Sequence, residues 1–496
     1  MPKDSAVEKP AQLRIETPFG SFFRRYFNTK IGITFGIAFL LSLPIYLQLL
    51  PITPGWVPLA EVWNNWHRVN WLQLGREIVS FLSLSIGLFL IFRVRFYPFW
   101  LGFFIGVLWF HWVSFSFYYY QMGYLIPLVI LALGIGYGLL FWAVGGVIGI
   151  IEKKIPERYR DGVRRLLWGL FLFLLPNFKP FTFNWLQFQP LLATTPLPPT
   201  SAELGILLIA LFLLACRRIL HKELGAALLL LSLLLPVYSP QLLPLIEVGA
   251  VSTDIPQDQK WNQRVIPTEI AEELMAIQTL IKGGYQLVIT PEVSFPLVLN
   301  NYPPLVEELA LLSKGGAILV GSLYHGEKGL YNVGYLFQHG RLEQIIKKHI
   351  LVPFGEYIPL PFFHDLINKI FHSGAEDLER APTFGHFKIL FRPPSYHPNL
   401  PPRVVEFLLG ICYELTSEEL YTQSPIYIVG LSNNGWFFLP GIPFSIEPIL
   451  QRLLIEYYSY NYKKVVFHTT NRSGSYIINV GRYQPLEGIS LKWRGR

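Results

Sequence analysis

The feature that most constrains the fold of this chain is an abrupt change of composition near residue 245. Residues 30–245 consist mainly of apolar runs with few carboxylates, whereas residues 246–496 have an ordinary mixed composition. Over all 496 residues, 52% are hydrophobic and 15% are charged, which is far more apolar than a soluble protein of this size. The sequence predicts a polar segment at 1–30, a helical membrane domain at 31–245 and a globular domain at 246–496.

The membrane domain contains seven apolar runs of a length that approaches the ~20 residues needed to cross a bilayer. The second, fifth and sixth are short for a bilayer, so the sequence either leaves the limits of these spans open or indicates tilted or kinked helices. The spans are expected at 31–51, 77–92, 97–118, 123–151, 166–178, 202–216 and 224–245.

Basic residues indicate the orientation of these spans, because they gather before the first span and after the second, fourth and sixth. The positive-inside rule then places the amino terminus in the cytoplasm, and seven spans place residues 246–496 on the opposite side. The net charge of +8 therefore reports topology, and we expect no nucleic-acid partner. Residues 1–30 are too long and too charged for a signal peptide, so we expect no cleavage.

The globular half is predicted to be an α+β domain. Buried-type strands outnumber helices, and helical periodicity is found at 267–282, 303–313 and about 446–460. Two sheets packed face to face with helices outside, an αββα sandwich, would accommodate this order of elements.

One strand of this domain ends at a cysteine. Residues 407–411 form an apolar run, Cys412 follows, and Thr416 or Ser417 is a candidate cap for a helix. A thiol placed before a helix start is expected to favour its thiolate form. The alternative is a buried core thiol, which is also our interpretation of Cys216. With only two cysteines in the chain, a disulfide framework is excluded.

Two other residues occupy comparable positions, since Glu292 follows a strand and Lys348 follows a hairpin strand. A carboxylate, an ammonium and a thiol are sufficient for acyl transfer: the first accepts the thiol proton, the second stabilises the oxyanion and the third carries the acyl group. Neither position is specific alone, because Lys347 and Lys348 could equally be a solvated pair on an edge strand.

The surrounding motifs are specific. The globular half resembles the nitrilase superfamily, and the whole arrangement resembles the apolipoprotein N-acyltransferase family, in which seven spans precede that domain. The resembling residues are Ile255-Pro-Gln-x-x-Lys-Trp261, Pro291-Glu292, Tyr331-Asn332, Lys348-x-x-Leu-Val-Pro-Phe-Gly-Glu-Tyr-x-Pro359, Cys412-Tyr-Glu414 and Ser432-Asn-Asn-Gly-Trp-Phe437.

The resemblance implies a role for each matching residue. Glu292 would be the general base, Lys348 the oxyanion lysine and Cys412 the nucleophile, with Glu356 holding the lysine. Three further positions match residues that the family uses to handle substrate or to close loops, namely Trp261, Tyr413 and Glu414.

The resemblance also implies the reaction. An acyl chain would pass from a membrane phospholipid to the cysteine, and then to the α-amine of a lipoprotein's amino-terminal diacylglyceryl-cysteine. We expect a monomer in the bacterial inner membrane with its catalytic domain on the periplasmic side. We expect no cofactor, and no metal, because no His/Cys cluster has ligand spacing.

Some residues depart from the family pattern. No apolar run follows residue 480, where the family has an eighth span, and residues 437–442 lack the family's Gly and His. These departures bear on the acceptor, so two alternatives stay open: a membrane-tethered amidase, and an acyltransferase paralogue with a different acceptor. A scaffold with a vestigial site is a third interpretation, which the intact Glu292, Lys348 and Cys412 disfavour.

Overall fold

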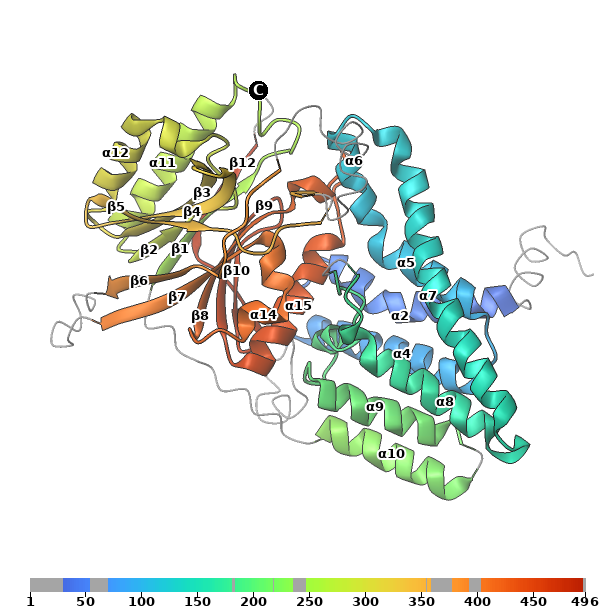
Figure 1. The fold of residues 1–496 in the computed structure, drawn as a ribbon. Helices are drawn as coiled ribbons and strands as arrows, with labels where there is room; N and C mark the ends of the chain where they lie inside the picture. The colour runs from blue at the N-terminus through green and yellow to red at the C-terminus, as the bar shows by residue number, and fades with distance from the viewer. Residues whose placement is uncertain are drawn as a thin grey trace, which may run out of the picture.

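The first half of the chain folds into a bundle of helices that lies beside the sheets of the second half (Figure 1). The computed structural model describes residues 30–53, 70–180, 183–216, 218–234, 247–353, 355–357, 377–391 and 403–493. The longer helices of the bundle are α2 (Lys30–Tyr46), α4 (Trp71–Arg93), α5 (Pro98–Phe110), α7 (Ile126–Lys154), α8 (Glu157–Leu174), α9 (Ser201–Leu214) and α10 (Ile219–Leu234).

Each of the seven expected spans has a helix at its position, but the lengths differ from the expectation. Within the described residues, four segments are long and apolar enough to cross a membrane: Lys30–Leu49, Trp71–Arg93, Pro98–Tyr119 and Gly123–Lys154. The other three helices are shorter or carry a charged first turn. The end of the seventh expected span, residues 235–245, lies outside the described residues. The number of spans therefore stays a prediction.

The second expected span, 77–92, is part of a longer helix, α4, which spans Trp71–Arg93. Helix α4 begins at Trp71 because the Asn70 side chain caps it, accepting from the Gln73 N–H at 3.2 Å. Arg76 in its second turn is buried and donates to the carbonyls of Ile52 and Thr53. A polar side chain whose hydrogen bonds are made within the protein does not end a helix, although it ends an apolar run in the sequence.

Helices α5 and α7 pack closely. A Cβ at Gly102 would lie only 2.2 Å from the Tyr137 carbonyl oxygen, so only glycine allows this approach of the two backbones. The opposite face of α7 is exposed and apolar, including Leu128, Trp142 and Val147. An exposed apolar face on a long helix is typical of contact with lipid.

The second half forms the predicted αββα sandwich. Its first sheet has the strand order β5-β4-β3-β2-β1 and its second has β9-β8-β7-β6, and β1 and β9 meet at one residue pair, Thr253 with Asn471. The strands are β1 (Val248–Asp254), β2 (Leu287–Ile289), β3 (Ala317–Gly326), β4 (Gly329–Gln338), β5 (Arg341–Lys347), β6 (His386–Phe391), β7 (Arg403–Ile411), β8 (Tyr427–Asn433), β9 (Val465–Asn471), β10 (Tyr476–Asn479), β11 (Arg482–Pro485) and β12 (Gly488–Lys492).

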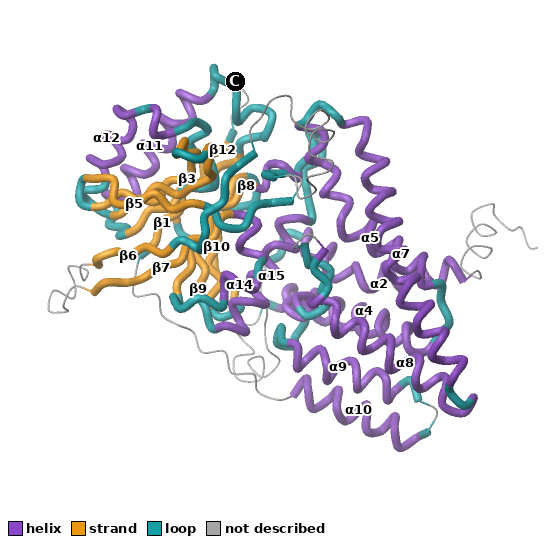
Figure 2. Tube along the Cα trace, viewed as in Figure 1, coloured by secondary structure: helices purple, strands orange, loops and turns teal. Residues whose placement is uncertain are grey.

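Apolar side chains from the two sheets fill the space between them, including Ile289, Leu319, Phe407 and Val429. Helices α11 (Ile266–Lys282) and α12 (Pro303–Leu312) cover the outer face of the first sheet. Helix α15 (Glu447–Tyr462) covers the second sheet and also faces the membrane helices (Figure 2).

The two halves share one continuous core, which is why α15 is buried on almost every side. Polar contacts cross the boundary as well: the Asn461 amide donates to the Pro199 carbonyl, and the Trp185 indole donates to the Thr416 hydroxyl. The globular half therefore packs directly against the helices of the first half.

Candidate active site

Three strand ends bring Glu292, Lys348 and Cys412 to one edge of the sandwich. Glu292 follows β2, Lys348 follows β5, and Cys412 follows β7. Lys348 is anchored by its own backbone, because its N–H donates to the Asn332 carbonyl of the neighbouring strand β4 at 2.9 Å. Residues that are far apart in sequence thus meet where the apolar strands end.

Three donors surround the carboxylate of Glu292, which is only 7% exposed. Asn332 Nδ2 donates to Oε1 at 2.8 Å, the backbone N–H of Asn433 donates to Oε2 at 2.8 Å, and Lys348 Nζ lies 3.5 Å from Oε1. Donors of this kind stabilise the ionised form of a buried carboxylate and fix its direction.

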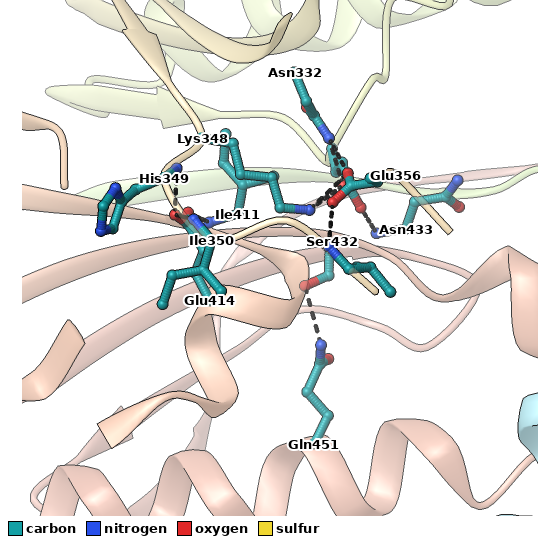
Figure 3. Close-up of polar contacts among 12 residues, drawn as sticks. Asn332, Lys348, His349, Ile350, Glu356, Ile411, Glu414, Ser432, Asn433 and Gln451 are labelled. Carbon is teal, nitrogen blue, oxygen red and sulfur yellow. Dashed lines mark hydrogen bonds and ion pairs between the residues drawn. The ribbon is translucent and has the colours of Figure 1, made fainter. Parts of the chain in front are cut away.

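Lys348 is buried between two carboxylates (Figure 3). Its ammonium donates to Glu356 Oε1 at 2.8 Å, and the other oxygen of Glu356 accepts from the Val352 N–H at 2.8 Å. Burial alone would lower the pKa of Lys348, but the charges of Glu356 and Glu292 raise it above its ordinary value. The lysine therefore remains a permanent cation at neutral pH.

Cys412 lies on a strained turn. Its φ angle is +52°, which a residue with a side chain rarely adopts and which is characteristic of functional sites. Burial and the charge of Glu292 raise the pKa of the thiol well above its ordinary value, and the charge of Lys348 acts against this rise. The expectation that the thiolate is favoured is wrong, because desolvation outweighs the positive charge.

The expected helix after Cys412 is also different. Residues Cys412–Thr416 form a 3-10 turn and α14 spans only Glu418–Tyr421, with no hydrogen bond from the Ser417 side chain to the helix. Thr416 instead donates to the Tyr413 carbonyl. A helix this short carries little dipole, so it offers little stabilisation to a thiolate.

Glu414 organises the loops around the cysteine (Figure 3). One carboxylate oxygen accepts from the backbone N–H groups of His349 and Ile350 at 2.7 and 2.9 Å, and the other accepts from Ile411 at 2.7 Å. Burial raises the pKa of Glu414 to about 7, while these donors and Lys348 oppose that rise. Glu414 thus ties the loop after Lys348 to the turn that bears Cys412.

Comparisons with known proteins identify the relatives of this chain. Residues 28–236 match the apolipoprotein N-acyltransferase integral membrane domain. An apolipoprotein N-acyltransferase from Wolinella succinogenes is 37% identical over 380 residues, which cover 76% of this chain and 83% of that protein. One from Helicobacter hepaticus is 32% identical over 415 residues, covering 81% and 95%. The chain belongs to the apolipoprotein N-acyltransferase family.

Membership in this family confirms the resemblance that the motifs indicated. Together with the long apolar helices, it makes the chain a membrane-bound acyltransferase. Among solved structures, an amidase of the nitrilase superfamily from Nesterenkonia AN1 matches 49% of this chain and 87% of its own, with 12% identity and a TM-score of 0.33.

Two residues expected to handle substrate have different surroundings in this acyltransferase. Tyr413 is buried at the boundary with the membrane helices, with 8% of its surface exposed. Trp261 is 44% exposed, on the turn after β1. A substrate role for Trp261 and Tyr413 stays a prediction, and the same holds for the catalytic roles of Glu292, Lys348 and Cys412.

Sequence reasoning missed several residues that contact the site. Asn332 donates to both Glu292 and Glu356, and Asn433 donates to Glu292 through its backbone. Lys260, next to Trp261, is buried and donates to the Glu292 carbonyl at 3.0 Å. Asn332, Asn433 and Lys260 all lie in the motifs that carry the resemblance, but a motif does not show which of its side chains turns inward.

An open cleft of about 650 Å³ lies between the membrane helices and the globular half. It is lined by Tyr119 from the end of the third span and by the loop at 438–443. Tyr119 donates to the Phe438 carbonyl, and Tyr120 stacks on Trp436 with ring centroids 5.5 Å apart. The cleft therefore borders the loop that follows Asn433. No group of metal-ligating side chains is found among the described residues.

Proposed function

We propose that this protein transfers a fatty acyl chain from a membrane phospholipid, through a thioester at Cys412, to the α-amine of the diacylglyceryl-cysteine at the amino terminus of a lipoprotein. The observation that carries the proposal is the buried Lys348 cation between two carboxylates. The acylation chemistry needs this cation and a base next to a cysteine on a strained turn. Membership in the family supports the choice of donor and acceptor.

In the first half of the reaction, Glu292 accepts the proton of the Cys412 thiol. The sulfur attacks the ester carbonyl of the phospholipid, and a tetrahedral oxyanion forms. Lys348, with the N–H that follows the nucleophile, stabilises this oxyanion. When the carbon–oxygen bond breaks, Glu292 returns the proton to the leaving alkoxide, which departs as a lysophospholipid alcohol.

In the second half, the acceptor amine attacks the thioester carbonyl and loses a proton to Glu292. The carbon–sulfur bond breaks, an amide remains on the acceptor, and the proton returns to Cys412. The enzyme ends in its starting state after two transfers, which is a ping-pong scheme. A thiol whose pKa is raised by burial fits this scheme, because a neutral thiol needs the base at the moment of attack.

The membrane helices supply the route to the lipids. The outer end of the third span, at Tyr119 and Tyr120, contacts the loop around Trp436 and Phe438. Lipid substrates can reach the site from the membrane surface without full transfer to water. The distribution of basic residues supports a cytoplasmic amino terminus, so that the site faces the periplasm from the inner membrane. We propose that a monomer suffices.

The acceptor is tested by discharge of the isolated acyl-enzyme. The acylated protein is mixed with a diacylglyceryl lipopeptide that has a free α-amine, with the same lipopeptide acetylated at that amine, or with buffer alone. We expect rapid discharge with the free amine only. Equal discharge in buffer would identify a hydrolase instead, and discharge by unrelated amines would identify a different acceptor.

A further inference from the structure

A second buried lysine lies behind the proposed base. Lys260 follows β1, has 2% of its surface exposed, and donates from Nζ to the backbone carbonyl of Glu292 at 3.0 Å. A lysine is almost never buried to this degree unless it is paired. Its contact is to the very residue that the mechanism uses as a base, although not to its carboxylate.

Two acids lie near this lysine on successive turns of α11. Glu269 and Glu273 are 6% and 1% exposed, and neither carboxyl oxygen of Glu269 has a hydrogen-bond partner in the described part of the chain. Burial raises the pKa of Glu269 to about 7 and that of Glu273 to about 8. Burial lowers the pKa of Lys260 to about 8, against the opposing charges of Glu292, Glu273 and Glu269.

This cluster is expensive for folding. Each ionisable group loses its hydration on burial, and a carboxyl oxygen without a hydrogen bond gains no interaction that offsets this free-energy cost. An apolar side chain in the place of Lys260 would pack without this cost. Costly buried charge beside a reacting group is typical of a functional role.

The turn that Lys260 contacts is itself conformationally demanding. Val293, directly after the base, has a φ angle of +45°. The backbone at Pro291 passes so close to β3 that a Cβ at Gly321 would lie 2.1 Å from its carbonyl oxygen. Thr290 and Ser294 close the turn through their hydroxyl groups, 2.6 Å apart. The hydrogen bond from Lys260 holds the middle of this turn.

We propose that Lys260 is a positioning residue for the Glu292 base, which it holds by a hydrogen bond to the backbone carbonyl and beside which it places a positive charge. The inference rests on the proposed function of Glu292. Other titratable groups interact electrostatically with Glu292 and with Lys260. Those near Glu292 are Lys348, Cys412 and Glu447. Those near Lys260 are Glu269, Glu273 and Cys412.

The test is the pH dependence of Cys412 acylation, followed as the mass gain of the protein in phospholipid micelles between pH 5 and 9. Lys260→Met removes the charge and the donor. Lys260→Gln keeps a donor without the charge, and Lys260→Arg keeps both. The matched control is Lys282→Met, which makes the same change of charge at an exposed position of α11.

Loss of a positive charge beside a general base moves the acid limb of the rate profile to higher pH. We expect the acid limb of the rate profile to move up by about one pH unit in Lys260→Met and Lys260→Gln. This shift corresponds to about a tenfold loss of rate on that limb. Lys260→Arg and Lys282→Met should keep the limb at its wild-type position.

A uniform loss of rate with an unmoved acid limb would assign Lys260 a structural role and overturn the inference. Failure of both uncharged variants to fold, while Lys260→Arg folds, would assign it to the structure in the same way. If the wild-type protein takes up no acyl group at all, the proposed function fails, and this inference with it.

Discussion

The Lys348 ammonium lies 2.8 Å from Glu356 and 3.5 Å from Glu292. The closer contact assigns the direct ion pair to Glu356, so that Glu292 accepts its shorter hydrogen bonds from neutral N–H groups of Asn332 and Asn433. Glu292 thus remains available to take a proton, while Glu356 keeps the lysine in place. This unequal sharing of one cation fits the proposed roles of Glu292 as the base and Glu356 as the support of the lysine.

The choice between the two adjacent lysines is decided by their surroundings. The side chain of Lys347 has different neighbours from that of Lys348: its ammonium lies 3.9 Å from the centre of the Tyr331 ring. We expect Lys348→Met to slow Cys412 acylation by about 10²–10³-fold, the usual loss for a residue that stabilises an oxyanion. Lys347→Met should keep nearly full activity. Acylation rates of both variants check this, and a larger loss in Lys347→Met would contradict it.

Glu414 is expected to act through the loops and not on the substrate. In Glu414→Gln, the amide nitrogen cannot accept a hydrogen bond, so at least one of the His349, Ile350 and Ile411 N–H groups is left unsatisfied. This should cost about 1–3 kcal/mol of stability and slow acylation. Thermal melting together with acylation rates tests it. A slower enzyme with unchanged melting would indicate a direct role in the reaction instead.

His468 makes stability depend on pH. Burial lowers its pKa to about 3, and its Nε2 lies 2.7 Å from the Ser432 hydroxyl. Below about pH 6.5 the unfolded chain takes up a proton at this position but the folded chain does not. Stability should therefore fall by about 1.4 kcal/mol per pH unit between pH 6.5 and 3 from this group alone.

The control for this pH dependence of stability is His468→Gln, because a glutamine side chain does not take up a proton. Melting of both proteins in detergent at pH 7.5, 6 and 5 should show a steeper loss for the wild type. Parallel curves would mean that His468 is protonated in the folded state, or that it does not limit stability.

Much of the sandwich could be predicted, because its strands are buried apolar runs bounded by turn residues. The apolar run at 407–411, for example, forms the end of strand β7 directly before Cys412. Strand β12 was missed. It pairs in parallel with β1 from the far end of the chain, and its short alternating sequence predicts no partner.

Glu292, Lys348 and Cys412 could be singled out because each follows a strand and lies in a motif of the resemblance, but their surroundings could not be predicted. Asn433 reaches Glu292 across 141 positions of sequence, and Asn332 across 40. Contacts of this kind depend on how the two sheets come together, which a local pattern does not encode. The same reason explains why Trp261 attracted notice while its neighbour Lys260 did not, and why desolvation of Cys412 was not foreseen.

The most direct test of the account is the intact mass of detergent-purified protein after incubation with phospholipid, with Cys412→Ala and Glu292→Gln measured beside the wild type. We expect a gain of one fatty acyl mass in the wild type, no gain in Cys412→Ala, and a gain in Glu292→Gln that is slower by about 10²–10⁴-fold. An adduct of the same mass in Cys412→Ala would contradict a thioester at this residue, and the absence of any adduct in the wild type would contradict acyl transfer from phospholipid.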